Sequence, residues 1–94
     1  MPLEKDYEDD VVAWAKDMGG EAVKLVDDGG RGWPDRTIFL PNAEIIIPEL
    51  KRPRKNKRYE QQKRRIAFLK RLGFAADFCE NMHELERLYE RFYG

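Results

Sequence analysis

Residues 29–58 read GGRGWPDRTIFLPNAEIIIPELKRPRKNKR and contain the signals that decide the fold. The segments RTIFL at 36–40 and EIIIPEL at 44–50 are rich in branched and aromatic residues, as strands are. The short PNA segment between them favours a tight hairpin. The stretch therefore predicts two antiparallel strands that are followed by a strongly basic segment, KRPRKNKR.

The other elements are predicted from periodicity and from residues that start or end helices. Apolar residues recur at helical spacing from Leu3 to Met18, and two glycines then end that helix. Asn81, with Glu84 three residues later, predicts a capping box at the start of a last helix. The predicted order is α-β-β-β-α-β-α, with helices over 3–18, 59–72 and 82–93 and strands over 22–26, 36–40, 44–50 and 74–79.

Aromatic side chains are expected mainly in the core. This holds for Trp14, Phe39, Phe68, Phe74 and Phe78, which are better explained by core packing than by stacking on bases. Trp33 stays open, because it precedes Asp35 in a loop where DNA or a second subunit could meet it. The last helix should turn Leu85, Leu88, Tyr89 and Phe92 inward, with Tyr93 closing the core or making a dimer contact; Cys79 should be a core residue and His83 a surface residue.

The chain has 94 residues, which suits one small domain spanning 1–94. Charged residues make up 38% of the sequence, so a compact and highly charged globule is expected. One cysteine and one histidine exclude an internal disulfide and a structural zinc site, so a bound metal must use oxygen ligands. The longest apolar run is too short to span a bilayer and the acidic start is unlike a signal peptide, which predicts a soluble, intracellular protein without membrane contact.

Positive and negative charges balance over the whole chain but not along it. Residues 1–50 carry 5 Lys or Arg against 12 Asp or Glu, and residues 51–94 carry 13 against 6, which together make 18 of each sign. The two halves therefore have net charges of −7 and +7. Such clustering indicates contact with a polyanion, although two charge-complementary halves that fold against each other would show the same pattern.

Three charged side chains of the opening stretch are expected to meet. Asp35 closes the GWPD turn as one strand begins, and alternation along the next strand puts Glu49 and Lys51 on one face. An antiparallel hairpin brings Asp35 beside the end of that strand. Two neighbouring carboxylates need a cation between them, and a hard divalent ion such as Mg²⁺ suits oxygen ligands, among them the backbone carbonyl of Leu50.

Such a site suits phosphodiester hydrolysis, which needs an activated water and stabilisation of charge on the phosphate and on the leaving oxygen. Lys51 would hold or polarise the water and neutralise phosphate charge. Glu8 or Glu4 is a further candidate ligand of the metal or the water, and Gln62 is a candidate to bond the phosphate or the water. Cations would bind neighbouring phosphates, namely Arg31, Arg36, Arg52, Arg54, Lys55, Lys57, Arg58 and Lys63, with Arg64, Arg65 and Arg71 following.

The order of these motifs resembles that of the virus-type replication-repair nucleases (VRR-NUC), within the PD-(D/E)XK superfamily that includes the archaeal Holliday junction resolvases. The resemblance covers nearly the whole chain, through EKDYE, GGEAVKLV, GRGWPDRTIFLPNAEIIIPELKRP and QKRRIAFLKRLGF. It implies an α/β PD-(D/E)XK (restriction-endonuclease-like) core, a mixed sheet of about four strands flanked by helices. The family's motifs match Asp35 and Glu49 as ligands of Mg²⁺ or Mn²⁺, Lys51 as catalytic, Gln62 on the next helix and Glu8 as the helix acid, although Glu4 also fits.

The resemblance further implies a homodimer that cuts branched DNA such as Holliday junctions, in a cytoplasmic setting of bacterial or phage type. The leading interpretation is a metal-dependent, structure-selective DNA endonuclease. A non-catalytic nucleic-acid-binding module that retains the basic segment is the alternative. A structural or regulatory protein whose charged halves simply pair is a third hypothesis, and it predicts no salt-sensitive affinity for DNA.

One residue departs from the family pattern. Pro48 precedes Glu49 where the family usually has an apolar residue that favours strands. Because proline has no backbone donor, Pro48 is expected where its nitrogen faces no partner, at an edge or a bulge. The side on which Glu49 and Lys51 project does not depend on this.

Overall fold

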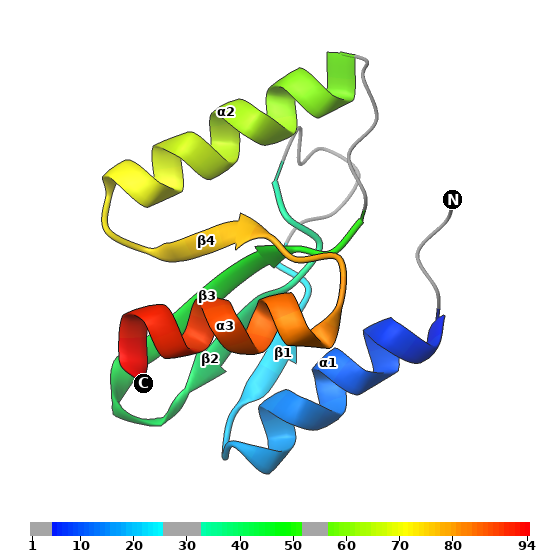
Figure 1. The fold of residues 1–94 in the computed structure, drawn as a ribbon, viewed down its shortest axis with the longest axis vertical. Coiled ribbons are helices and arrows are strands. Elements are labelled where there is room, and N and C mark those ends of the chain that lie inside the picture. The colour runs from blue at the N-terminus through cyan, green and yellow to red at the C-terminus, as the bar shows by residue number, and fades with distance from the viewer. Residues whose placement is uncertain (1–4, 26–32, 52–56) are drawn as a thin grey trace.

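The computed structural model describes residues 5–25, 33–51 and 57–94, and its elements follow the predicted order (Figure 1). The first strand is shorter than predicted, because it ends at Val23. In the described part of the chain, no helix is long and apolar enough to cross a membrane. The elements are α1 (Lys5–Asp17), β1 (Glu21–Val23), β2 (Thr37–Leu40), the 3-10 turn η1 (Pro41–Ala43), β3 (Glu44–Glu49), α2 (Lys57–Arg71), β4 (Ala75–Phe78) and α3 (Met82–Tyr93).

The strands form one sheet in the order β1-β2-β3-β4. β1 pairs with β2 and β2 with β3 in antiparallel fashion, whereas β3 and β4 are parallel. A parallel pair needs a crossover connection, and α2 lies between these two strands in the chain. The predicted α/β fold with a mixed sheet flanked by helices is therefore confirmed.

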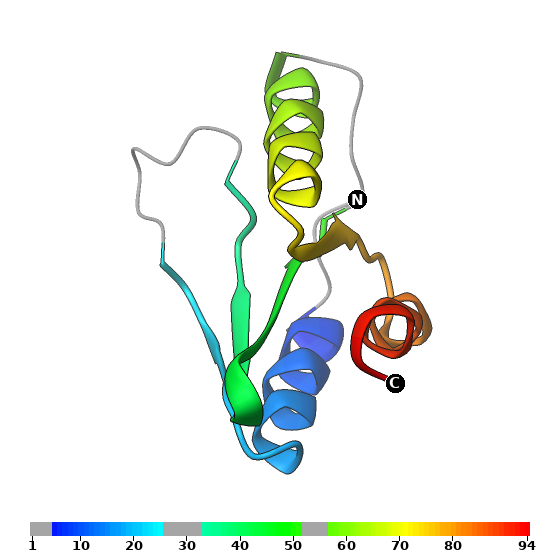
Figure 2. The same ribbon diagram turned by 90° about the vertical axis from the view of Figure 1, so that its left-hand side faces the viewer.

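Strand alternation divides the core into two hydrophobic clusters. α1 and α3 contribute to one cluster, in which Ile46 and Leu85 are fully buried, and Figure 2 shows both helices together on one side of the strands. α2 contributes to the other cluster, in which Leu69 meets Ile47. Consecutive residues of β3 thus pack on opposite faces of the sheet. Full burial of one such side chain stabilises the fold by about 1.5–3 kcal/mol.

Two glycines end α1 and bring it against the sheet. Gly19 has a φ of 93° and donates to the carbonyl of Lys16, while Gly20 donates to the carbonyl of Ala15. A Cβ on Gly20 would lie 1.9 Å from the carbonyl oxygen of Phe39, which only a glycine avoids. The predicted stop at this pair is confirmed, and the second glycine also allows the close approach of the turn to β2.

The start of α3 is capped as predicted on one side only. The side chain of Asn81 accepts a hydrogen bond from the backbone N–H of Glu84 at 2.9 Å. The Glu84 carboxylate accepts from the N–H of Glu80 at 2.7 Å, one residue before the donor that a capping box uses. The prediction of Asn81 as the N-cap is therefore confirmed, and the prediction of the reciprocal bond is wrong by one residue.

The predicted core holds for the small and aliphatic residues better than for the aromatic ones. Cys79 is buried, and burial raises the pKa of its thiol to about 12. Trp14 packs edge-on against Tyr89 with ring centroids 5.6 Å apart. Phe39 and Phe68 are 40% and 38% exposed, so their assignment to the core is wrong. Phe74 and Phe78 pack at the margin of the second cluster.

On α3, Leu85 and Leu88 are buried as predicted, whereas Phe92, predicted to point inward, is 42% exposed. His83 is exposed as predicted.

The two tyrosines of α3 tie the helix to the start of β3. Tyr93 donates from its hydroxyl to the carbonyl of Ile45 at 3.1 Å and accepts from the same residue's N–H at 3.2 Å. Tyr89 donates to the carboxylate of Glu44 at 2.9 Å, and this hydrogen bond raises the pKa of Tyr89. Of the two predicted roles for Tyr93, closing the core is the one that these contacts match.

Pro48 lies where one of its two neighbouring strands has stopped pairing. The last pair between β2 and β3 joins Ile38 to Ile46, whereas the pairing of β3 with β4 continues to Glu49. The carbonyl of Glu49 accepts from the N–H of Cys79, the residue after β4, so alternation turns the nitrogen of Pro48 toward β2, beyond the end of their ladder. This nitrogen therefore faces no strand partner, as predicted, although β3 is an inner strand and not an edge of the sheet.

Candidate active site

The structure brings Asp35, Glu49 and Lys51 together at one end of the sheet. Ile38 pairs with Ile46, so continuing the register by three residues sets Asp35 opposite Glu49, just beyond the last observed pair. The Lys51 ammonium lies 3.6 Å from Oδ2 of Asp35, and the backbone N–H of Lys51 lies 3.5 Å from Oε1 of Glu49. Lys51 is thus the residue through which the two carboxylates are connected.

Glu49 is a buried carboxylate at the end of β3. It is 1% exposed, and Gln62, which is 7% exposed on the first half of α2, donates from Nε2 to its Oε2 at 3.3 Å. Burial of a charged group without such donors is costly, so Gln62 and the backbone N–H of Lys51 help to orient this carboxylate. Gln62 was predicted to bond the phosphate or the water, and the structure gives it a contact with Glu49.

Glu8 belongs to a separate set of charges on the other side of the sheet. Its Oε1 lies 3.2 Å from Arg36 and 3.9 Å from Lys24, and Arg36 also donates to the carbonyl of Ala22 at 3.3 Å. Among the described residues, no three His, Cys, Asp or Glu side chains gather closely enough to hold a metal, so Glu8 does not complete a triad with Asp35 and Glu49. Glu4, the competing candidate, lies outside the described residues.

Arg36, predicted to contact DNA, pairs with Glu8 in the structure, and its contact with DNA stays a prediction. Only 16% of its side chain is exposed, because alternation turns Arg36 toward α1 when Asp35 faces the other way. Its Nε is buried and has no hydrogen-bond partner among the described residues. The guanidinium therefore depends on Glu8 and on the carbonyl of Ala22 for compensation of its charge and its donors.

The carboxylate oxygens at this end of the sheet are suitable ligands for a hard divalent cation. Asp35 and Glu49 present carboxylate oxygens, and the ammonium of Lys51 already balances the charge of Asp35. Mg²⁺ typically takes one or two protein carboxylates and completes its octahedron with waters and substrate phosphate oxygens, so two acids suffice for it. Ligation by the carbonyl of Leu50 stays a prediction.

Apart from Arg36, the predicted phosphate-binding cations whose side chains the structure describes lie on α2. Lys63 is ion-paired with Glu60 at 2.9 Å, lies over the ring of Tyr59, and has its pKa raised by the hydrogen bond with Glu60. Arg64 and Arg71 are exposed on the same helix. Arg31, Arg52, Arg54 and Lys55 lie outside the described residues, and Lys57 and Arg58 lie at the start of α2 with side chains that are not described.

A stacked pair beside the charged cluster was not predicted. The guanidinium of Arg65 on α2 lies 4.0 Å from the ring centroid of Trp33, which precedes Asp35 by two residues and is 37% exposed. The sequence left the role of Trp33 undecided, and this contact places it on an exposed aromatic surface next to the candidate site. The spacing of Gln62 and Arg65, one helical turn apart, could have indicated that both face the sheet.

Comparison with known proteins supports the fold described above. No family model matches the chain. A solved structure described as a "VRR_NUC domain" has a TM-score of 0.78 and 22% sequence identity, over 99% of this chain and 100% of that one. This chain has the fold of a VRR_NUC domain. The fold implied by the motif order is thereby confirmed.

One curated protein matches part of the sequence. The chain is 44% identical over 50 residues to "Putative nuclease p44" of Acyrthosiphon pisum secondary endosymbiont phage 1. The match covers 53% of this chain and 54% of that protein, so it spans about half the length of the relative.

Proposed function

We propose that this VRR_NUC-like chain is a metal-dependent DNA endonuclease that hydrolyses phosphodiester bonds at branched DNA such as Holliday junctions. The observation that carries the proposal is the contact of Lys51 with both Asp35 and the buried Glu49. A buried carboxylate is weak support for stability alone, because apolar side chains of similar volume serve a core as well or better. The fold and the partial likeness to a protein named as a nuclease support the same activity.

Lys51 supplies positive charge where the substrate phosphate would lie. Its side chain is 48% exposed and its ammonium is 3.6 Å from Asp35. The ammonium can therefore leave the Asp35 carboxylate and bind a phosphate oxygen of the substrate instead. At that position it would offset the charge that develops on the phosphate and would hold the attacking water by a hydrogen bond.

Asp35 and Glu49 are the proposed ligands of Mg²⁺ or Mn²⁺, together with the carbonyl of Leu50. The bound ion would supply Lewis-acid charge at the phosphate and at the attacking water. Glu49 accepts from the N–H of Lys51 at Oε1 and from Gln62 at Oε2, and these bonds help to hold the carboxylate in place. Glu8 contributes through Arg36, whose neighbour Asp35 it helps to position.

Recognition of the DNA would come from the basic residues beside this cluster. The described cations of α2 and the basic segment before it would contact phosphates without reading bases. A four-way junction needs cuts in two strands and each chain has one site, so we propose a two-fold homodimer. An intracellular location in a bacterial or phage setting stays a prediction.

The test is cleavage of a labelled four-way junction by purified protein with Mg²⁺ or Mn²⁺, beside a linear duplex of equal length. Junction cutting should stop with EDTA and fall by about 10²–10⁴-fold in Asp35→Ala and in Lys51→Ala. Asp10→Ala and Lys16→Ala change exposed charges on α1 and should cut at the wild-type rate.

Equal cutting by wild type and all variants would assign the activity to a contaminant or another site. Junction binding that survives chelation, with no cutting under any divalent ion, would replace the proposal by a nucleic-acid-binding module. Light scattering with the junction present tests the assembly, and a monomeric mass at micromolar concentration would reject the dimer.

A further inference from the structure

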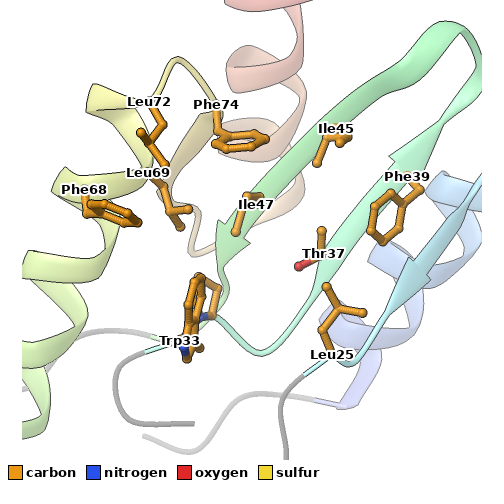
Figure 3. A pocket seen from close by; sticks show the side chains of 11 residues that line it. Leu25, Trp33, Thr37, Phe39, Ile45, Ile47, Phe68, Leu69, Leu72 and Phe74 are labelled. Carbon is orange, nitrogen blue, oxygen red and sulfur yellow. The ribbon is translucent and has the colours of Figure 1, made fainter.

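An apolar groove lies beside the charged cluster, between α2 and the strands β2 and β3. It has a volume of about 540 Å³, within the range of ligand pockets. Figure 3 shows Trp33, Ile47, Phe68 and Phe39 around a common space. Several large apolar side chains of this groove are not covered by other described residues. At least 37% of the surface is exposed in each of Trp33, Phe39, Phe68 and Leu72.

The groove and the charged cluster occupy one face of the sheet. Thr37 and Phe39 follow Asp35 at steps of two along β2, and Ile47 precedes Glu49 by two along β3. Alternation therefore points these side chains to the same side. A DNA strand whose phosphate lies at Lys51 would have neighbouring nucleotides within reach of the groove.

The α2 side of the groove is both aromatic and cationic. Phe68 lines the groove and also a second hollow of about 340 Å³, which it shares with Gln61, Arg64 and Arg65. Arg65 lies 4.0 Å from the centroid of Trp33 and 5.9 Å from that of Phe68. A flat apolar surface thus adjoins guanidinium groups that can bind a phosphate.

We propose that this groove receives unpaired nucleobases of the DNA substrate, stacked on Trp33 and Phe68, while Arg64 and Arg65 bind the adjoining phosphate. Aromatic side chains combined with a cationic groove are the means by which proteins hold single-stranded segments. The inference rests on the proposed function and extends it, because it makes the unpaired bases at a branch point the feature that is selected.

The charges favour DNA over a second copy of the chain as the occupant. A two-fold interface centred on α2 would bring Arg64, Arg65 and Arg71 close to the same residues of the other copy. Like charges that meet in an interface oppose association. Nucleic acid carries phosphates that match this rim, and its bases match the apolar floor.

The test measures DNA binding in EDTA, so that it does not depend on cutting. Two duplexes of equal length and charge contain a central unpaired segment, made of thymidines in one and of abasic sites in the other. Wild type should bind the thymidine probe about 10-fold or more tightly than the abasic probe, since base stacking on one aromatic side chain contributes that much. Trp33→Leu with Phe68→Leu should remove most of this ratio.

Phe92→Leu is the matched control, because Phe92 is also an exposed phenylalanine, 42% exposed, on the helix α3 of the opposite face. It should keep the wild-type ratio. Leu72→Lys, at a rim position that is 59% exposed, tests the groove without removing an aromatic ring and should lower the ratio. Circular dichroism checks that each variant is folded.

Equal binding of the two probes by wild type would overturn the inference, and this measurement needs no variant. A double variant that loses affinity for paired and unpaired DNA alike would also overturn it. A change from dimer to monomer with an unaltered ratio would assign the groove to a second copy instead. Absence of cutting on every substrate would reject the endonuclease and leave base binding standing.

Discussion

The two faces of the sheet differ in how completely the described helices cover them. On the face covered by α1 and α3, Ile38, Ile46 and Leu85 have no exposed surface. On the face covered by α2, Ile47 and Leu69 are buried, but Phe39 stays 40% exposed and the buried polar pair of Glu49 and Gln62 adjoins the core. One face therefore stabilises the fold, and the other combines a smaller core with the candidate chemistry.

The separation follows from strand alternation. Neighbours in the chain such as Ile46 and Ile47, or Asp35 and Arg36, face opposite sides, so each strand contributes to both functions at once. A substitution in β2 or β3 should affect either stability or activity according to the side it faces.

The largest effect is expected for Ile46→Ala, which should lower the free energy of unfolding by about 2–5 kcal/mol. The substitution leaves a cavity in the hydrophobic cluster that α1 and α3 cover. Ile46 is fully buried, whereas Ile45, the same residue type one position earlier, borders the groove and is only partly buried. Ile45→Ala should cost less than about half as much. Chemical denaturation of the two variants measures the difference. Equal losses would show that the two faces are equally important for stability.

A smaller effect, on activity, is expected for Gln62→Ala. It removes the donor to Oε2 of Glu49, and loss of a residue that orients a ligand typically lowers metal affinity or activity by about 10–100-fold. Gln61→Ala is the matched control, since Gln61 is exposed beside it on α2. Initial rates of junction cutting over a series of Mg²⁺ concentrations give both quantities. Identical curves for Gln62→Ala and wild type would separate Gln62 from the site.

The elements and the charged cluster could be predicted from the sequence because the signals for them are local. Two strands joined by PNA fix an antiparallel hairpin, and alternation then settles where Asp35, Glu49 and Lys51 point. The same alternation would have shown that Arg36 faces away from Asp35, although its partner Glu8 on α1 could only be known from the packing of that helix.

The exposed aromatic residues could not be predicted because their burial depends on where α2 lies. Phe39 and Phe68 have the composition and spacing of core residues, and both would be buried if α2 lay over β2. The second cluster shows that α2 instead packs on β3 and β4, through Ile47 and Ala76. Which strands a crossover helix covers is a tertiary property, and no local pattern determines it.

Glu8→Ala should cost about 1–2 kcal/mol of stability, because it leaves the mostly buried guanidinium of Arg36 without its carboxylate. The pair is partly exposed to solvent, so we expect less than the cost of breaking a fully buried ion pair. Asp9→Ala, at the exposed neighbouring position, should change stability little. If Glu8 acts through Arg36, the Mg²⁺ concentration for half-maximal cutting should stay at its wild-type value. A several-fold increase in that concentration would make Glu8 a metal ligand.

The smallest effect is expected at the N-cap of α3, which covers one face of the sheet together with α1. Asn81→Ala removes the acceptor of the Glu84 N–H and should lower the free energy of unfolding by about 1 kcal/mol, while Asn81→Asp keeps an acceptor and should lose little. Cutting well below the melting temperature should be unchanged in both, because α3 contributes no side chain to the contacts of Asp35, Glu49 or Lys51 among the described residues. Reduced cutting by folded Asn81→Ala would mean that the face covered by α1 and α3 controls the positions of Asp35, Glu49 and Lys51 on the opposite face. The two faces would then not be independent.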